Sequence, residues 1–198
     1  MGTREKSNSD LILSIDAGTQ SIRAALIDLE GEIRGIAKTP MRMSDSPQPG
    51  WAEQDPEYFW DILRAACAEL FAKTSESKDS IRGVAVTTQR NTVIDVDKNG
   101  APLRPAIVWL DERKADSRAA LPPALRLPLK ILGLHTLIDG AIKDCESKWI
   151  RQNQPEIWER VHKHIYLSGW FNLKLTGEFS DSSGSIVGYT PFSVKKGD

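Results

Sequence analysis

The stretch LSIDAGTQSIRAALID, residues 13–28, predicts two strands joined by a polar turn. Apolar residues alternate on both sides of the turn, which is the period of a half-buried strand. The turn from Asp16 to Ser21 holds a carboxylate, a glycine, an amide and two hydroxyls, and Arg23 follows it. A simple hairpin needs only two turn residues such as Asn-Gly. So many hydrogen-bonding groups in one turn indicate either a binding site or a turn that uses them for its own backbone.

The neighbouring segments extend these strands into a mixed sheet. Strands are predicted at 11–16, 22–28 and 32–43, and Gly31 lies where a hairpin glycine is expected. Short connections make these three strands antiparallel neighbours, because parallel neighbours need long crossovers.

A crossover helix comes next. Asp55 suits the N-cap of a helix and Pro56 its first position, and apolar residues then recur at helical spacing. The nearly apolar strand predicted at 80–88 is therefore a parallel addition to the sheet. Further elements are expected as strands at 92–97, 104–111 and 164–167 and as helices at 146–153, 155–161 and 169–175. We predict one α/β domain with βββαβ order, a mixed sheet and helical insertions.

Composition narrows the class of protein. The 198 residues are 40% hydrophobic and 27% charged, with 26 Lys and Arg against 27 acids. A formal charge of −1 gives no basic surplus, so we expect neither nucleic acid nor a membrane as partner. Residues 1–10 are polar and predict a disordered tail without a signal peptide. Cys67 and Cys145 read as reduced thiols, and we expect a cytoplasmic protein.

The first turn has groups that suit a phosphate and its metal. Asp16 ends a strand and can hold Mg²⁺ through water. Gly18 permits close approach of a ligand to the backbone. Donors for phosphate oxygens are available in the residues that follow, Thr19, Gln20, Ser21 and Arg23. The alternative is that Asp16 and Thr19 only satisfy the turn backbone.

Two further clusters suit a ligand rich in hydroxyls. TTQRNT places Gln89, Arg90 and Asn91 at the end of a strand, where they can form paired hydrogen bonds. VWLDER brings Trp109 and Asp111 together, and an indole beside charged groups commonly forms one wall of a sugar site. The alternatives are a solvated loop for the first cluster, and for the second a core tryptophan with an N-cap aspartate.

The ordered set of motifs resembles one family. DAGTQSIR, PGWAEQDP, TTQRNTVIDVD, AIVWLDER, SKWIRQNQPEIW and LTGEFSDSSGS follow one another at fitting separations. This set is similar to the N-terminal part of the FGGY carbohydrate kinases, which include glycerol kinase, xylulokinase and ribulokinase. The resemblance runs from Leu11 to Asp198 and implies a ribonuclease H-like fold of the actin and Hsp70 superfamily. An unrelated member of that superfamily would explain DAGT but not WLDER or LTGEF.

The resemblance implies an ATP-dependent phosphorylation of a sugar or polyol hydroxyl with Mg²⁺. Asp16 matches the family aspartate that acts around the metal and the transferred phosphoryl group, and residues 18–23 match the first phosphate loop. Arg90 matches a substrate-contacting arginine, and Trp109 matches the tryptophan that lines the polyol pocket. Phosphoryl transfer depends mostly on positioning and charge stabilisation, so these residue types fit the chemistry.

Some residues depart from the better-known members. Asn91 stands where glycerol kinase has Glu, and Ala141 stands where it has Tyr, so two polyol contacts are missing. Xylulokinases have Met-His-Gly near residues 87–91. We therefore expect another sugar or polyol as substrate.

Family members are more than twice as long as this chain. The resemblance implies that the C-terminal ATP-binding domain and the catalytic base lie beyond Asp198, so we predict that residues 11–198 alone are inactive. The family also implies a homodimer. The alternative is a stand-alone, non-catalytic module that binds sugar or regulates. A fragment, unlike such a module, should expose apolar surface where the missing part docks.

Overall fold

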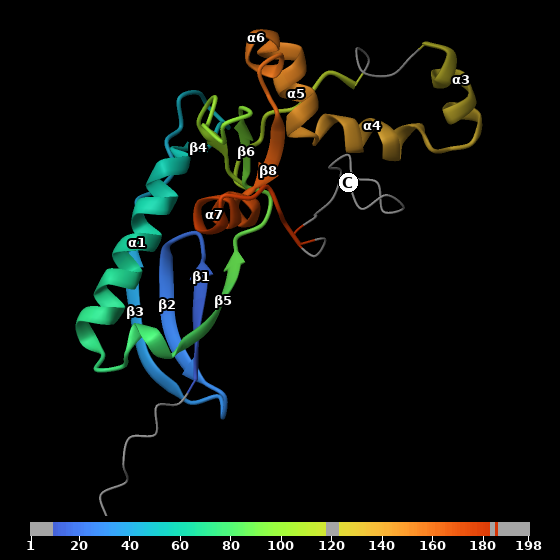
Figure 1. Ribbon diagram of the computed structural model, residues 1–198. Coiled ribbons are helices and arrows are strands. Elements are labelled where there is room, and N and C mark those ends of the chain that lie inside the picture. Colours follow the sequence, from blue (N-terminus) through green and yellow to red (C-terminus); the bar gives the residue numbers. More distant parts are fainter. Residues whose placement is uncertain (1–9, 118–122, 183–184, 186–198) are drawn as a thin grey trace, which may run out of the picture. The chain divides into compact units, whose positions relative to one another are not determined.

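The computed structural model describes residues 10–117, 123–182 and Ser185 (Figure 1). Its chain forms two compact units. The first unit comprises Met1–Met43 and Glu57–Gln89, and the second comprises Ser44–Pro56 and Arg90–Asp198. The main chain therefore passes between the two units more than once.

The first unit is built on a mixed sheet. The sheet has the order β3-β2-β1-β5, formed by β1 (Leu11–Ala17), β2 (Ser21–Asp28), β3 (Ile33–Pro40) and β5 (Ile81–Thr88). The pairs β1–β2 and β2–β3 are antiparallel, and β1–β5 is parallel. This topology confirms the predicted mixed sheet and its βββαβ order.

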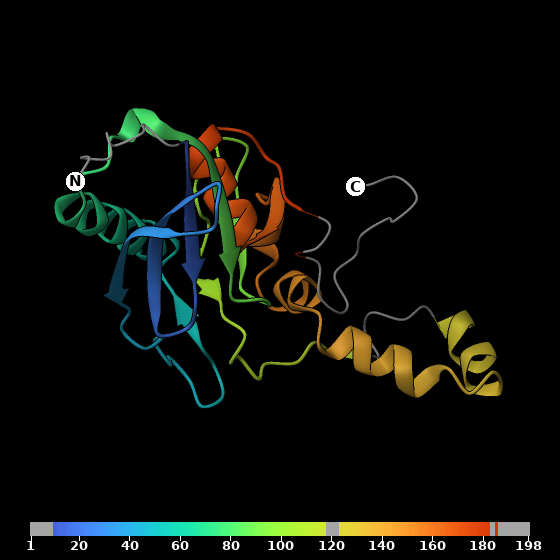
Figure 2. The same ribbon diagram turned by 90° about the horizontal axis from the view of Figure 1, so that it is seen from below.

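Helix α1 (Pro56–Lys73) supplies the crossover to β5, by way of the short helix η1 (Lys78–Ser80). It begins at Pro56 as predicted, and it buries Phe59 and Leu70 among its apolar residues. Gly35 of β3 lets the helix approach closely, because a Cβ there would lie 3.1 Å from Leu70 Cδ1. Figure 2 shows α1 lying along one face of this sheet.

The second unit contains an antiparallel sheet that the sequence did not predict. Its order is β4-β7-β6-β8, from β4 (Glu53–Gln54), β6 (Val93–Val96), β7 (Ala106–Ile107) and β8 (Lys163–Tyr166). The strand predicted at 104–111 is wrong in extent, since only Ala106 and Ile107 are extended. The chain turns directly after β7, and that turn matters for the site.

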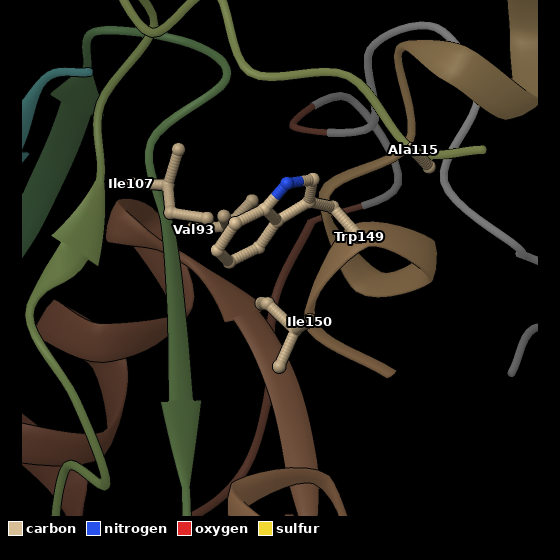
Figure 3. Packing of buried hydrophobic residues seen from close by; sticks show 5 residues of the cluster. All are labelled: Val93, Ile107, Ala115, Trp149 and Ile150. Atoms are coloured by element: carbon tan, nitrogen blue, oxygen red, sulfur yellow. The ribbon is translucent and has the colours of Figure 1, made fainter. Parts of the chain in front are cut away.

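Helices complete the second unit. They are α3 (Pro123–Ile131), α4 (His135–Lys143), α5 (Glu146–Asn153), α6 (Pro155–Trp158) and α7 (Leu167–Thr176). Helix α7 ends as predicted at Gly177, whose φ of 79° is left-handed and favours glycine. Figure 3 shows the cluster in which α5 meets the sheet, made of Val93, Ile107, Ala115, Trp149 and Ile150.

The chain ends lie partly outside the described residues. Residues 1–9 of the predicted tail are among those not described, whereas Asp10 accepts a hydrogen bond of 2.8 Å from Arg82 Nε. No helix within the described residues is long and apolar enough to span a bilayer.

Candidate functional site

The turn between β1 and β2 is short and tied on both sides. Gly18 N donates to Ser21 O at 3.1 Å, which leaves Thr19 and Gln20 at the exposed tip. Gln20 O accepts from Met41 N at 2.9 Å, so the tip is held from the β3 side. Ser21 is buried, and Thr19 and Gln20 are therefore the side chains of the predicted trio that face solvent.

Gly18 is not required by the backbone of this turn. Its φ lies outside the left-handed region, and a Cβ there would meet only Ser21 O, at the ordinary contact distance of 3.6 Å. By contrast, Gly31 in the next hairpin has a φ of 88° that L side chains rarely adopt. The fold itself thus gives no reason for glycine at position 18.

Asp16 and Arg23 face each other across the two strands. They are direct cross-strand partners, and Arg23 Nη1 donates to Asp16 Oδ2 at 2.9 Å. The side chains are 49% and 44% exposed, so this pair is accessible and adds little stability. In the described part of the chain Asp16 Oδ1 accepts no hydrogen bond, so a carboxylate oxygen remains for a hydrated cation.

The TTQRNT cluster begins at the same edge of the sheet as the turn. Gln89 N donates to Ala17 O at 2.8 Å, which places the end of β5 beside the end of β1. Arg90 and Asn91 belong to the second unit and are exposed. Asn91 has a φ of 53°, a conformation that Asn tolerates better than most residues. The backbone at this position therefore offers its own reason for an asparagine.

Trp109 is presented by a tight turn that follows β7. Asp111 N donates to Val108 O at 2.9 Å, so Trp109 and Leu110 occupy the two central positions. Their exposed fractions are 49% and 46%. The alternative of a core tryptophan at this position is therefore wrong, and the indole is accessible to a ligand.

Asp111 has a different environment from Trp109. Its Oδ1 accepts from Arg113 N at 2.9 Å and from Arg113 Nε at 2.7 Å. Its Oδ2 accepts from Arg113 Nη2 at 2.6 Å and from Ala52 N at 2.7 Å. The side chain is 3% exposed and its acceptor positions are filled. This geometry favours a role in holding the turn over the direct substrate contact that the sequence suggested.

Arg113 and Glu53 are the residues that the sequence reasoning missed. Arg113 is 2% exposed, and its Nη2 also donates to Glu53 Oε1 at 2.9 Å. Its guanidinium carbon lies 3.9 Å from the ring centroid of Trp51 and 4.7 Å from that of Trp149. The sequence offered only local signals for this group, the Arg in WLDER and the Trp in PGW. Their contacts could not be predicted, because Arg113 and its partners Glu53 and Trp51 lie far apart in the sequence.

A second buried guanidinium shares the same carboxylate. Arg104 Nη2 donates to Glu53 Oε1 at 2.5 Å, and the Arg104 side chain is 3% exposed. Burial lowers the pKa of Arg104, while the charge of Glu53 opposes that shift. Glu53 therefore pairs with both buried cations, while Asp111 is the second carboxylate of Arg113, and the PGWAEQ and WLDER segments depend on each other through Glu53.

Glu146, at the start of α5, is expected to make stability fall with rising pH. Burial raises its pKa above 4.5, and Asp111 and Asp144 add to the shift, whereas its own backbone N–H and His164 oppose it. The unfolded chain loses this proton first, so the folded state is destabilised as pH rises from 4.5 through the raised value. Glu146→Gln should therefore stabilise the protein at neutral pH.

Urea unfolding at a series of pH values checks this expectation. The gain from Glu146→Gln should be present at pH 7 and vanish below pH 4.5, the ordinary pKa of the side chain. Glu156→Gln, which changes the exposed first-turn acid of α6, is the matched control and should give no such pH-dependent gain. A gain that is equal at all pH values would contradict the assignment.

The fold and the family match together identify a carbohydrate kinase domain. Residues 11–198 match the model of the FGGY family of carbohydrate kinases, N-terminal domain. The chain belongs to this family, as the sequence motifs predicted, and its sheet is that of the ribonuclease H-like, actin-like fold.

Individual relatives agree with this assignment. A glycerol kinase of Carboxydothermus hydrogenoformans is 33% identical over 190 residues, which are 89% of this chain and 37% of that protein. The structure of xylulose kinase from Rhodospirillum rubrum superposes with a TM-score of 0.72 at 26% identity, covering 94% of this chain and 39% of that one. The structure of Plasmodium falciparum glycerol kinase with ADP gives a TM-score of 0.59 at 26% identity, covering 85% and 35%. This chain therefore spans well under half the length of these relatives.

Proposed function

We propose that the protein phosphorylates a hydroxyl group of a sugar or polyol with Mg-ATP. The observation that carries the proposal is the family match over residues 11–198, together with the accessible Asp16 carboxylate beside an open turn. Relatives with glycerol kinase and xylulose kinase in their names, one of them with ADP, support the reaction class. The departures at Asn91 and Ala141 favour a substrate other than glycerol.

The phosphate side of the proposed site is the β1–β2 turn. Asp16 holds a hydrated Mg²⁺ through its carboxylate, and Arg23 opposite it adds positive charge for phosphate oxygens. The backbone from Gly18 to Ser21 and the exposed side chains of Thr19 and Gln20 supply donors. A Mg²⁺ ion held there by Asp16 would supply positive charge to the transferred phosphoryl group.

For sugar binding we propose Gln89, Arg90, Asn91 and Trp109. The exposed guanidinium of Arg90 can donate paired hydrogen bonds to neighbouring hydroxyls, which gives specificity for a polyhydroxylated ligand. The half-exposed indole of Trp109 offers a flat apolar wall for the C–H face of the ligand.

We further propose that residues 11–198 work with a second, nucleotide-binding domain and are inactive without it, in a cytoplasmic enzyme that forms homodimers. The chain covers only 37% of its glycerol kinase relative, which supports this view. Exposed apolar side chains, which are expected where a missing part docks, also support it: Val84 on the edge strand β5 is 49% exposed, and Ile131 on α3 is 77% exposed.

The alternative is a stand-alone, non-catalytic module that binds sugar or regulates. The intact mass of the protein from its own cells distinguishes the kinase from the module. A kinase with a second domain should have about twice the mass of this chain or more.

Gly18→Ala tests the phosphate side. Because the fold tolerates a Cβ at this position, the free energy of unfolding should stay within about 1 kcal/mol of the wild type. Phosphoryl transfer by the whole protein should fall about 10- to 100-fold, since the methyl group displaces the phosphate. Gly31→Ala is the matched control: its φ of 88° makes it destabilising, but transfer by the folded protein should be unchanged. Equal activity of Gly18→Ala and wild type would contradict the assignment.

Trp109→Ala tests the sugar side. The KM for the sugar should rise about 10- to 100-fold, which corresponds to about 1.4–2.8 kcal/mol of lost binding. The KM for ATP should not change, and stability should change little because the indole is half exposed. Leu110→Ala is the matched control, since Leu110 occupies the same turn and is 46% exposed. An equal effect of both substitutions on the sugar KM would remove the specific role of Trp109.

A further inference from the structure

We infer that Arg113 is a positioning residue that sets the location of the Trp109 indole, an inference that rests on the proposed sugar site. Arg113 is too deeply buried, at 2% exposure, to act as a substrate contact. Its hydrogen bonds nevertheless end on the residue that closes the Trp109 turn.

The Trp109 turn is fastened to a segment far away in the sequence. Val108 N donates to Ala52 O at 3.1 Å, and Glu112 N donates to Gly50 O at 2.7 Å. Between these two bonds, Ala52 N donates to the Asp111 carboxylate at 2.7 Å. The turn is therefore held at both ends by backbone hydrogen bonds. The hydrogen bond between them involves the Asp111 side chain, whose direction is set by its hydrogen bonds to Arg113.

Arg113 is itself held from three directions. Glu53 accepts from it at 2.9 Å, and the rings of Trp51 and Trp149 lie 3.9 Å and 4.7 Å from the guanidinium carbon. The two indoles meet edge to face, with centroids 5.1 Å apart. A planar guanidinium between these groups has little freedom to move. It therefore holds the Asp111 carboxylate in one position relative to the core, and Asp111 in turn holds the Trp109 turn.

The contacts require an arginine rather than any cation. Nε and Nη2 together bind both oxygens of Asp111, while Nη2 also reaches Glu53. A lysine keeps the charge and the contact with the rings but has a single nitrogen, so it loses the paired geometry. Buried ion pairs are poor sources of stability, whereas they can fix one arrangement of a segment. Arg113→Lys should therefore shift the Trp109 turn without removing the charge.

The test reads the position of Trp109 and substrate binding separately. In the 198-residue chain, the ¹H–¹⁵N signals of the six indoles report each tryptophan, and Trp109→Ala assigns the signal of interest. Arg113→Lys should shift or broaden the Trp109 signal. Ile150→Val, a change in the same buried cluster that leaves the Arg113 contacts intact, should not. Asp111→Asn loses the negative charge of the acceptor but keeps the size of the side chain, so it should behave like Arg113→Lys. It replaces Arg113→Lys in the test if that variant does not fold.

Kinetics of the whole protein complete the test. Arg113→Lys should raise the sugar KM about 10- to 100-fold with an unchanged KM for ATP, and combining it with Trp109→Ala should add little further loss. Additive losses, or an unmoved indole signal, would overturn the positioning role. If Trp109→Ala itself leaves every sugar KM unchanged, the proposed sugar site fails, while a shifted indole signal would still support the link between Arg113 and the turn.

Discussion

Asp16→Ala is expected to lower phosphoryl transfer by about 10³-fold, the size of effect typical for losing one electrostatic contact with the transition state. The Asp16 carboxylate is half exposed at the end of β1, and its partner in the fold is Arg23. In the proposed site, its loss removes the oxygen assigned to hydrated Mg²⁺ near the transferred phosphate. Sugar binding and stability should hardly change, because a pair of this exposure contributes at most about 1 kcal/mol. Steady-state ADP release and sugar calorimetry on the whole protein separate these effects.

Asp10→Ala is the matched control for Asp16→Ala. Asp10 precedes the same strand at its other end, is 45% exposed and binds Arg82 at 2.8 Å, so the two aspartates are alike in exposure and pairing. Only their position relative to the β1–β2 turn differs. Asp10→Ala should leave phosphoryl transfer within about twofold of the wild type, since a surface pair of this kind contributes little. If both substitutions reduced transfer equally, or if Asp16→Ala kept most of its activity, Asp16 would not be the metal-holding residue.

Glu53→Ala is expected to cause the largest loss of stability, about 3–5 kcal/mol, because it leaves the buried guanidinium of Arg104 without its carboxylate and that of Arg113 with Asp111 alone. Arg104 and Arg113 are 3% and 2% exposed, so water does not easily replace Glu53. For a chain of this size, such a loss lowers Tm by roughly 6–20 °C. Thermal unfolding followed by tryptophan fluorescence measures it, since Trp51 and Trp149 lie against the Arg113 side chain.

Glu69→Ala controls for the loss of a charge in general. Glu69 also pairs with a cation, Lys73 one turn further along α1, but the two side chains are 36% and 60% exposed. Its loss should cost no more than about 0.5 kcal/mol. A Glu53→Ala protein within 1 kcal/mol of the wild type, in the range of a surface pair, would show that Arg104 and Arg113 are hydrated or find other partners.

The first unit could be predicted because its signals are local. Alternating apolar residues and short turns specify β1 to β3, the Asp55-Pro56 pair begins α1, and the apolar run ending in Thr88 forms β5. The hairpin register also brings Asp16 opposite Arg23, so the two chemical groups of the turn follow from the strand pattern.

The second unit shows where local reasoning fails. Glu53 and Gln54 lie in a segment rich in Pro and Ser, where no strand was predicted, yet they pair with Ala106 and Ile107. The apolar run at 104–111 resembled one strand, but Arg104 is drawn into an ion pair and Asp111 closes a turn. These features depend on contacts between residues more than fifty positions apart, such as Arg104 with Glu53 at a separation of 51.

The same reason explains the different outcomes for Trp109 and Asp111. The motif VWLDER suggested that both face a ligand, because an indole and a carboxylate are typical of sugar sites. The accessible indole is consistent with that role, whereas the carboxylate is occupied by Arg113 and Ala52. Residue type alone does not distinguish a group that contacts substrate from one that holds the contacting group in place.

The most direct measurement is transfer of the terminal phosphate of Mg-ATP by the whole protein across a panel of polyols, ketoses and sugar acids. We expect sugar-dependent ADP formation with at least one member of the panel, reduced about 10³-fold in Asp16→Ala and within about twofold of the wild type in Asp10→Ala. Binding of a sugar without any ADP formation, in a natural product that ends near Asp198, would contradict it and leave a binding module.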